Sequence, residues 1–528
     1  MARNADSGPI TSLSASAIKK LKYPDECELR VWLRENSDVE PLPLSGHALY
    51  LIGKGIEHEA RVLDRLVELH GACVDIGGLD NDNALADTAA AVGIGGQMIY
   101  QGMLRAETEV DGETVEIIGY PDFLIPVGDG WEISDAKLPK TVFAGTEKDP
   151  FKPKPKQEHV FFQLRLYGWL FEQSYPGVPF TLCVYTGSNE REVIEYDGGA
   201  SPLAELEVVM QIRRLKEEPE VIVGLTKCEK CEYHDHCWPR AKETKALGYV
   251  TDIDTKLALS LMADGVTTYP EILDRYDAES LTELKSPSKR HPDRPENQGP
   301  ARKVIENVQA LEAGTTLRRR GPDGNEVELD PAVSCDPSYV MFDVENTPAG
   351  GDVEEFVYLW GLQVCGEAAG EFIPVFADFD EGADERCWRE FLAVCMQLIA
   401  DNPGIKFVHW SPHDATMIKT YMKRYDDGAG DGATVLESLL NLEPATTAAL
   451  AMPIAGSSLK RVEKLVGFER TTDVAKGDDS IVAFEEAQET DDPKLRAEIV
   501  ADLCAYNRED LEATWFVQQW IVETCSAN

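Results

Sequence analysis

Residues 338–345 are Ser338-Tyr-Val-Met-Phe342-Asp343-Val-Glu345, a β-branched and aromatic run that ends in two carboxylates. Such residues favour an extended strand. Successive side chains of a strand point to opposite faces, so Asp343 and Glu345 point to the same face. A shared metal site needs carboxylates in this arrangement, although an isolated Asp-x-Glu pair is common without one. The interpretation therefore depends on the elements that follow.

Those elements come in a defined order. Further β-rich runs, bounded by turn residues, lie at Phe356–Val364 and Phe372–Phe376. A helix is expected from about Asp384 to Ala400, followed by a short strand at Lys406–Trp410. Further helices are expected near Asp414–Tyr425, Ser458–Val466 and Lys494–Thr524. Three strands, a helix, a strand and more helices are the order of an RNase H-like fold, which we expect from residue 333 onward.

Further acidic residues follow the first strand at suitable places. Asp414 starts a helix directly after a strand, and Asp510 lies four residues after Tyr506, on the same face of the last helix. In this order the set resembles the DEDD family of DnaQ-like 3′–5′ exonucleases, which use two metal ions. The resemblance implies that Asp343, Glu345, Asp414 and Asp510 bind metal and catalyse, and that Tyr506 orients the attacking water.

Alternatives remain open at this site. Asp414 follows Pro412 and His413, which are not the residues that the family pattern leads us to expect. Glu509 competes with Asp510, but it would face another way on the helix. A catalytically degenerate domain that only binds nucleic acid is also consistent with the sequence.

A second carboxylate pair lies in the N-terminal half. Two strand patterns, at 119–125 and 131–138, flank a predicted hairpin turn. Asp135 and Lys137 project to one side of the second strand, and Asp122 on its neighbour can reach the same point. Two carboxylates converging there would hold a divalent cation, and the lysine could orient or help deprotonate the attacking water.

Residues on either side complete a longer pattern. The run Lys54-Gly-Ile-Glu-His58-Glu59 is expected to open a helix before the pair, and Gln163 and Tyr167 share a helix face after it. The ordered set Gly-x-x-His, Asp, Asp-x-Lys and Gln-x-x-x-Tyr resembles the RecB-type branch of the PD-(D/E)XK nucleases, with a restriction-endonuclease-like core. The resemblance assigns metal ligation to His58, Asp122, Asp135 and the Ala136 carbonyl, catalysis to Lys137, and DNA contact to Gln163 and Tyr167.

A cysteine cluster follows the second pattern. Cys228, Cys231 and Cys237 have the spacing Cys-x2-Cys-x5-Cys, and Cys27 is a candidate for a remote fourth ligand. Three late cysteines and one early cysteine resemble the iron–sulfur-stapled nucleases of the same superfamily, such as the CRISPR-associated adaptation exonucleases and the AddB subunits. That resemblance implies a structural 4Fe–4S cluster. Zn²⁺ is the alternative, because two histidines lie within the cluster and a Cys3His site needs no remote cysteine.

The composition limits the class of protein. The formal net charge is -43, from 94 acidic and 51 basic residues, and the acidic residues are interspersed through the chain. This pattern is typical of halophilic proteins, and at molar salt the Debye length is only about 3 Å, so the charge does not exclude a nucleic-acid partner. No uncharged apolar run reaches the roughly 18 residues of a membrane span, and no signal-peptide pattern opens the chain. We therefore expect a cytoplasmic protein without a membrane partner.

Three regions are predicted: a RecB-type nuclease domain with the cluster at 1–245, a helical connector at 246–332, and an RNase H-like exonuclease domain at 333–528. A charged loop at 286–295 lies in the connector.

Two features of the connector have alternative interpretations. The helix, glycine turn and helix pattern at 257–273 resembles helical hairpins that bind DNA backbones through amides, and a packing linker is equally consistent with it. Arg318, Arg319 and Arg320 would meet phosphates or lie in a solvated loop.

The expected protein is an α/β multidomain nuclease that hydrolyses single-stranded or end-exposed DNA with Mg²⁺ or Mn²⁺, in repair or processing. RNA is an alternative substrate of the C-terminal site. The sequence contains no P-loop pattern, so a helicase or repair partner would act in trans. The alternatives are a catalytically degenerate nucleic-acid-binding scaffold and a CRISPR spacer-acquisition exonuclease.

Overall fold

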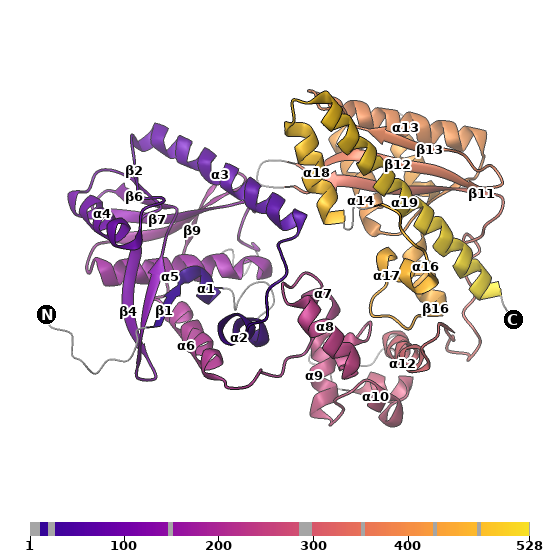
Figure 1. Cartoon of the computed structure of the whole chain (residues 1–528), viewed down its shortest axis with the longest axis horizontal. Coiled ribbons are helices and arrows are strands. Elements are labelled where there is room, and N and C mark those ends of the chain that lie inside the picture. Colours follow the sequence, from indigo (N-terminus) through magenta and orange to yellow (C-terminus); the bar gives the residue numbers. More distant parts are fainter. Residues whose placement is uncertain are drawn as a thin grey trace. The chain divides into compact units, whose positions relative to one another are not determined.

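The computed structural model describes residues 11–19, 27–145, 152–284, 298–349, 354–425, 430–472 and 477–526. The chain forms two compact units, shown in Figure 1 with colours that follow the sequence. The first unit comprises residues 1–41, 50–221 and 349–354, and the second comprises residues 42–49, 222–348 and 355–528. The cysteine cluster and the helical connector thus group with the C-terminal part, and the division into three regions stays a prediction. The predicted charged loop at 286–295 lies outside the described residues.

The first unit contains two sheets. The larger has the strand order β2-β3-β6-β7-β8-β9, and the smaller has the order β1-β5-β4. The strands are β1 (Thr11–Ser14), β2 (Val74–Asp75), β3 (Ile99–Tyr100), β4 (Leu104–Val110), β5 (Glu113–Gly119), β6 (Phe123–Val127), β7 (Gly130–Lys137), β8 (Phe180–Thr186) and β9 (Arg191–Ile194). The helices are α1 (Ala15–Lys19), α2 (Glu28–Asn36), α3 (Gly46–His70), α4 (Asn81–Ile94), α5 (Glu158–Ser174) and α6 (Ala200–Arg214).

The hairpin of β6 and β7 lies where the turn pattern placed it, and β7 then pairs in parallel with β8. Helix α5 makes the crossover between these parallel strands. Its side chains are apolar almost all round and are buried from Val160 to Phe171, as a helix covered on several sides requires.

Two predicted boundaries are wrong. The strand pattern at 119–125 is divided, because Gly119 ends β5 and β6 begins only at Phe123. Helix α3 begins at Gly46 rather than at Lys54, so His58 and Glu59 lie inside a long helix.

The second unit contains a five-stranded sheet of order β13-β12-β11-β14-β15, in which β11 to β13 are antiparallel and β14 and β15 run parallel to β11. A short pair of β10 and β16 accompanies it. Its strands are β10 (Leu317–Arg318), β11 (Ser338–Thr347), β12 (Phe356–Gly366), β13 (Phe372–Phe376), β14 (Lys406–His409), β15 (Leu439–Asn441) and β16 (Leu450–Ala451).

The helices predicted at 257–273, 384–400, 414–425, 458–466 and 494–524 are present, and the unit contains further helices that were not predicted. The helices are α7 (Leu225–Cys228), α8 (His234–Glu243), α9 (Thr255–Ala263), α10 (Pro270–Arg275), α11 (Ala278–Glu283), α12 (Gln298–Ala313), α13 (Ala383–Asp401), α14 (Pro412–Arg424), α15 (Asp431–Ser438), α16 (Leu442–Ala449), α17 (Leu459–Val466), α18 (Gly477–Glu489) and α19 (Pro493–Ser526). Within the described part of the chain, no helix has both the length and the apolar character needed to cross a membrane.

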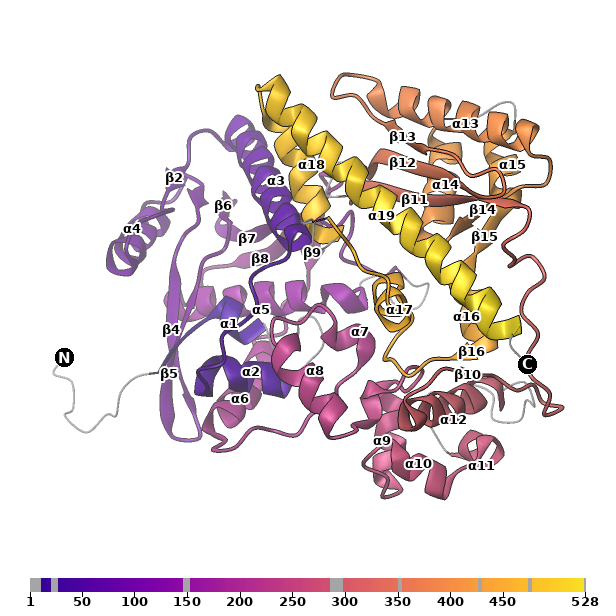
Figure 2. The same cartoon turned by 45° about the vertical axis from the view of Figure 1, so that its right-hand side comes forward.

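The two faces of the five-stranded sheet are covered by different helices. Val340 and Phe342 of β11 pack in a core with residues of α13, α14 and α15. Tyr339 and Met341 instead pack in a core with Leu511 and other residues of α19. Figure 2 shows α19 crossing the sheet along β11 and β12. Because strand side chains alternate, Asp343 and Glu345 share the α19 face with Tyr339 and Met341.

The connector is a packed element of the second unit. Ala258 and Leu261 of α9 are buried in one core with Ile272 of α10, and Gly265 at the turn has φ +84°. The backbone amides of Thr267 and Thr268 donate to the carboxylate of Glu271, so these two amides are already hydrogen-bonded. This geometry favours the packing interpretation over DNA binding at the turn.

The three arginines of the run lie in different surroundings. Arg319 is buried, and its guanidinium donates to Glu306 and Asn307 and to the carbonyls of Thr447 and Leu450. Its neighbours Arg318 and Arg320 donate to backbone carbonyls at Val327 and Gly324. Arg319 therefore ties the connector to the RNase H-like part, whereas Arg320 is exposed to solvent, and contact of the run with phosphates stays a prediction.

Candidate metal centres

Three carboxylates of the second unit gather at one point. Asp343 and Glu345 come from β11 and Asp510 comes from α19, and one oxygen of each lies within 4.8 Å of the other two. Oxygen ligands from carboxylates are those that Mg²⁺ and Mn²⁺ prefer. The strand alternation and the helix position that the sequence predicted thus bring these three residues together.

The electrostatics of this group fit a cation. Burial and the neighbouring Asp414, Asp510 and Glu345 raise the pKa of Asp343 well above its usual range. Burial and Asp510 raise the pKa of Glu345 to about 8, although Ser480 and Tyr358 donate hydrogen bonds to it. Like charges held together away from water disfavour ionisation, and a divalent cation among the three oxygens would remove that cost.

Asp414 lies beside this group and belongs to a second polar contact. It is buried in the first turn of α14, with Oδ2 3.2 Å from Nδ1 of His409. The same Nδ1 lies 2.7 Å from the carbonyl of Ser411, which can only accept, so Nδ1 carries the proton. Asp414 is near enough to raise the pKa of Asp343, although it is not among the three oxygens that cluster.

Tyr506 has a partner that the sequence analysis missed. Lys460 of α17 donates from Nζ to the Tyr506 hydroxyl at 2.8 Å. Burial and then Asp510 raise the pKa of Tyr506, which keeps the phenol protonated. The hydroxyl oxygen accepts from Lys460, and its own hydrogen remains to be donated elsewhere. The spacing of Tyr506 from Asp510 was visible in the sequence, whereas a lysine 46 residues away was not.

Arg470 is the second cation missed from sequence. It donates to both carboxylate oxygens of the buried Glu463, at 2.9 and 2.7 Å, and also pairs with Asp510. Glu509 faces away from the group, because Thr471 and Thr472 donate to it. Asp510 is therefore the helix carboxylate that reaches the centre, held in position by Arg470.

Asn507 of α19 holds the side chain of Asp343, and this contact requires that α19 lie close to the strands below it. Its side-chain amide donates to Asp343 Oδ2 at 2.8 Å, and its side chain is fully buried. The neighbouring position on β12 is Gly361, which pairs with Asp343 in the sheet. A Cβ at position 361 would lie 1.7 Å from Asn507 Oδ1, so only glycine leaves room for this amide.

Gly361→Ala is therefore expected to lower both stability and activity of the second unit. Overpacking of a buried contact costs about 1–3 kcal/mol, and each 1 kcal/mol lowers the melting temperature of a domain of about 150–250 residues by about 2–4 °C, so a fall of about 2–12 °C is expected. The displaced amide no longer holds Asp343. Thermal unfolding followed by circular dichroism, together with cleavage assays, checks this.

Gly370→Ala is the matched control, because a Cβ there makes only an ordinary contact of 3.8 Å with Val364. The double variant Gly361→Ala/Asn507→Ala removes the clash and is expected to regain stability without regaining activity. An unchanged melting temperature for Gly361→Ala alone would contradict the close approach.

The carboxylates of the first unit also converge with their lysine. Asp135 is buried at 1% exposure; its Oδ1 accepts from the backbone amide of Asp122 at 3.1 Å, and its Oδ2 accepts from Lys137 Nζ at 2.8 Å. Asp122 Oδ2 in turn accepts from the backbone amide of Ala136 at 2.8 Å. Burial and Asp135 raise the pKa of Asp122. Burial alone would lower the pKa of Lys137, but the two carboxylates raise it.

Glu59 is a third carboxylate near this pair, and it contributes to the raised pKa of Asp122. Tyr100 and Gln101 both donate to Glu59, at 2.8 and 3.0 Å. The adjacent His58 is buried, with Nε2 3.2 Å from the carbonyl of Tyr185. His58 was predicted to bind the metal, although Glu59 is the residue of the same run whose charge acts on Asp122.

Gln163 and Tyr167 share one face of α5, as their spacing predicted. Both side chains are buried, and Gln163 Nε2 donates to the Tyr167 hydroxyl at 2.7 Å. Burial and the charges of Asp135 and Asp122 raise the pKa of the Tyr167 phenol ring. Gly119 leaves room for that ring, because a Cβ there would lie 2.7 Å from it. Contact with DNA by these two residues stays a prediction.

The cysteines of the cluster lie around α7 and α8. Cys228 is buried, and the backbone amide of Gly224 donates to its sulfur at 3.5 Å. The amide of Tyr233 donates to the sulfur of Cys231 at 3.5 Å. Cys237 lies in α8, and Cys27 immediately precedes α2 in the first unit. Amide donors to sulfur are suited to thiolate ligands.

Residues 340–522 match the family model of the RNase_H superfamily. No curated protein matches the sequence. A crystal structure of SSO0001 is similar to the chain at 14% sequence identity, over 45% of this chain and 88% of that chain, with a TM-score of 0.22, a value too low to support an argument.

The family match covers the five-stranded sheet and all three clustered carboxylates. The C-terminal part of the second unit therefore has an RNase H-like fold. Such a domain indicates a nucleic-acid-cleaving hydrolase, because RNase H-like nucleases use divalent metals held by carboxylates. Asp343, Glu345 and Asp510 can bind such a metal.

Proposed function

We propose that this protein is a metal-dependent nuclease that hydrolyses phosphodiester bonds of single-stranded or end-exposed DNA at two centres. The observation that carries the proposal is the convergence of Asp343, Glu345 and Asp510 within a domain that matches the RNase_H superfamily. The similar convergence of Asp122, Asp135 and Lys137 supports a second centre of RecB type.

At the C-terminal centre, the divalent ions would polarise the phosphoryl oxygen and favour an ionised water. Asp343, Glu345 and Asp510 would hold these ions, with Asp414 as the fourth acidic residue of the set. The Tyr506 hydroxyl, which accepts from Lys460, keeps its hydrogen to donate to the attacking water. Asn507 and Arg470 keep Asp343 and Asp510 in place.

At the N-terminal centre, Asp122, Asp135 and the Ala136 carbonyl would hold the metal, with His58 as the predicted additional ligand and Glu59 as a nearby acidic residue. Lys137 would orient or deprotonate the attacking water. Its raised pKa arises from the carboxylates beside it, and a cation bound by those carboxylates would lower it again. Lys137 can then take part in proton transfer.

The test of the proposal is nucleotide release from DNA single strands labelled at the 5′ or the 3′ end, with Mn²⁺, Mg²⁺ or EDTA, in low and high salt. We expect cleavage with either metal and none with EDTA, and shortening from one labelled end reveals the polarity. Binding of DNA without any metal-dependent release would instead support the degenerate scaffold. A matched RNA strand tests the alternative substrate of the C-terminal centre.

The proposal also includes a 4Fe–4S cluster held by Cys27, Cys228, Cys231 and Cys237, with a structural role. The backbone amides that donate to the sulfurs of the buried Cys228 and the half-buried Cys231 favour thiolate ligation. Anaerobically purified protein is expected to be brown, with iron and acid-labile sulfide in equal amounts, and Cys231→Ser is expected to lose both. The buried Cys395→Ser, in α13, is the control. Colourless protein that contains one zinc ion per chain would contradict the iron–sulfur cluster and support the Cys3His zinc site.

A further inference from the structure

The lysines of the first unit are gathered in one segment. Between Lys54 and Lys216 the sequence contains six lysines, and all of them lie between residues 137 and 156. One of them is Lys137 of the N-terminal centre. Residues 140–156 carry the other five and only two acidic residues, a formal net charge of +3 in a chain whose net charge is -43. This segment is therefore a local exception in an acidic protein.

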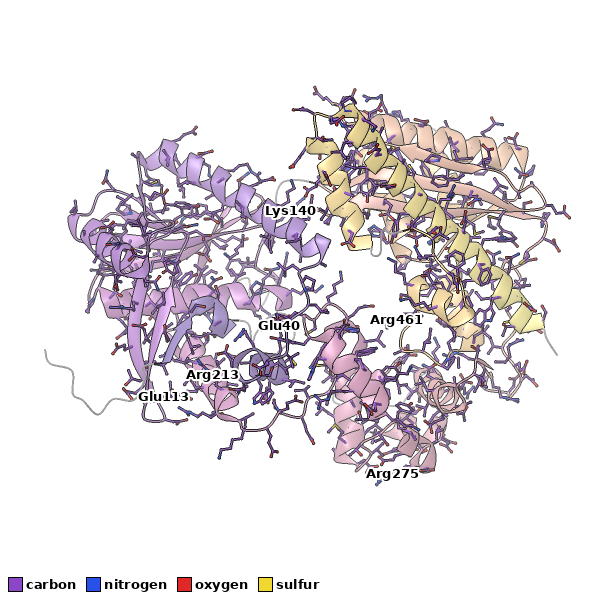
Figure 3. The ribbon with its side chains drawn as sticks, viewed as in Figure 1. Glu40, Glu113, Lys140, Arg213, Arg275 and Arg461 are labelled. Atoms are coloured by element: carbon purple, nitrogen blue, oxygen red, sulfur yellow. The ribbon has the colours of Figure 1, made fainter. Side chains whose placement is uncertain are left out.

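The arginines of the same stretch are engaged within the fold. Arg65 donates to the carbonyl of Asn189. The other six have carboxylate partners, in the pairs Arg61–Glu57, Arg105–Glu116, Arg165–Asp197, Arg191–Glu132, Arg213–Glu35 and Arg214–Glu113. In Figure 3, Lys140 lies well apart from Arg213 and Glu113. The positive charges of the arginines are thus compensated by neighbours, and the lysine segment is separate from them.

The lysines of the segment lack such partners. Lys140, Lys152 and Lys156 are exposed, and Lys154 is half-buried. Among the residues that the structure describes, none of these four forms a salt bridge. Glu158 follows the segment in the first turn of α5, where a negative charge stabilises the helix. The four ammonium groups are therefore available to an anionic ligand.

The backbone that carries these lysines is held in place. We call residues 140–145 and 152–156 the lysine strap. Its two arms pair in antiparallel, with Phe143 opposite Pro153. Glu192 of β9 accepts from a backbone amide of the first arm at 2.9 Å, and Phe143 packs edge-on against a phenylalanine of α5, with ring centroids 5.3 Å apart. The strap is thus anchored to both the sheet and the helix.

The strap adjoins the N-terminal centre at both of its ends. It follows β7, and the three-residue step from Lys137 to Lys140 spans at most about 11 Å. It leads into α5, which carries Gln163 and Tyr167. One strand of B-DNA advances about 3.4 Å per phosphate, so about 11 Å corresponds to about three nucleotides. A strand cut at Asp135 therefore has phosphates within reach of the strap.

We propose that the lysine strap binds the phosphates of the polynucleotide strand that is cleaved at the N-terminal centre, a few nucleotides from the scissile bond. The inference rests on the proposed nuclease function and adds to it a binding site formed by residues outside the nuclease motifs. Phosphate contacts position a strand without reading its bases, so the site serves substrates of any sequence.

The test compares Lys152→Gln/Lys156→Gln with Lys216→Gln/Lys256→Gln, which removes the same charge from exposed positions outside the strap. Both are made in the full chain with Asp343→Asn, so that only the N-terminal centre cleaves. KM for a thymidine 12-mer is measured with Mn²⁺ from 50 to 200 mM salt.

Each lost phosphate contact lowers the slope of log KM against log salt by about 0.7, so the strap pair should lose about 1.4 and the control pair nothing. Over this fourfold range of salt, the rise in KM should be about sevenfold smaller for the strap pair than for its parent. The melting temperature and kcat should stay unchanged. Lys140→Gln, on the other arm, should lose about 0.7 by itself even if the pair folds poorly.

Two comparisons separate lost contacts from a disturbed centre. Lys152→Arg/Lys156→Arg keeps both charges and should keep the parental KM and slope. A thymidine dinucleotide has one phosphodiester and none left for the strap, so its kcat/KM should be the same in every variant. An equal loss of dinucleotide cleavage in the strap pair would overturn the phosphate assignment.

The remaining outcomes distinguish the two proposals. If the Asp343→Asn protein cleaves the 12-mer and the strap variants keep its KM and slope, the strap assignment is overturned and the nuclease proposal stands. If it cleaves nothing, the N-terminal nuclease assignment fails, and anisotropy of a fluorescein-labelled 12-mer in EDTA decides the strap. A slope smaller by about 1.4 in the strap pair would then keep it as a polynucleotide-binding site, whereas equal slopes or no binding would overturn it.

Discussion

Replacing Asp343 by asparagine is expected to lower cleavage at the C-terminal centre about 10³-fold, without lowering the stability of the fold. A cation that polarises the phosphoryl oxygen contributes several kcal/mol, and each 1.36 kcal/mol corresponds to a tenfold change in rate. The asparagine still accepts from Asn507 but no longer offers the charged ligand that the cation needs.

The stability of this variant separates loss of function from unfolding. Burial, Asp414, Asp510 and Glu345 raise the pKa of Asp343, and an acid whose pKa is raised in the folded state costs stability when it ionises at neutral pH. The neutral side chain removes that cost, so the melting temperature in EDTA should stay level or rise.

The measurement uses the Asp135→Asn background, in which the N-terminal centre is disabled, and follows nucleotide release with Mn²⁺. Asp502→Asn makes the same chemical change at an exposed position of α19 and should leave the rate unchanged. Full activity of Asp343→Asn in that background would remove the C-terminal catalytic assignment.

The second large effect is expected at Asp135 and Lys137. Asp135→Asn should lower cleavage at the N-terminal centre about 10³-fold, by the same loss of a metal ligand. Lys137→Ala leaves Asp122 and Asp135 together without their cationic neighbour and removes the proposed proton carrier, an effect of about 10²–10⁴-fold. Both are measured in the Asp343→Asn background.

Two variants refine this result. Lys137→Arg keeps the positive charge but cannot give up a proton, so activity that survives it would assign Lys137 a purely electrostatic role. Asp129→Asn, at the exposed turn that closes the other end of the β6–β7 hairpin, is the control. If Asp135→Asn/Asp343→Asn still releases nucleotides, neither centre performs the reaction.

Local patterns predicted much of the fold of the second unit. Runs of β-branched and aromatic residues between turn residues predicted the observed bounds of β13, Phe372–Phe376, and placed β11 and β12 within a few residues. The two-residue period of a strand placed Asp343 and Glu345 on one face. These features depend on residues that lie close together in the sequence, so they can be predicted from it.

Contacts between distant segments could not be predicted in this way. Lys460 and Arg470 reach Tyr506 and Asp510 from a helix and loop whose packing no local period specifies. The direction in which each side chain of α3 points could not be predicted from the sequence either. Consecutive helical residues point about 100° apart, so His58 and Glu59 face different surroundings, and only the packed strands decide which one approaches Asp122.

The anchoring of Arg319 has a practical consequence for dissecting the protein. A recombinant fragment that starts at residue 333 would discard β10 and this guanidinium, and would leave the Thr447 and Leu450 carbonyls without those donors. Unsatisfied buried acceptors cost about 1–3 kcal/mol each. Fragments that begin near residue 222 instead keep the connector together with the RNase H-like part, although they lack residues 42–49 of the second unit, and are the better choice for isolating its chemistry.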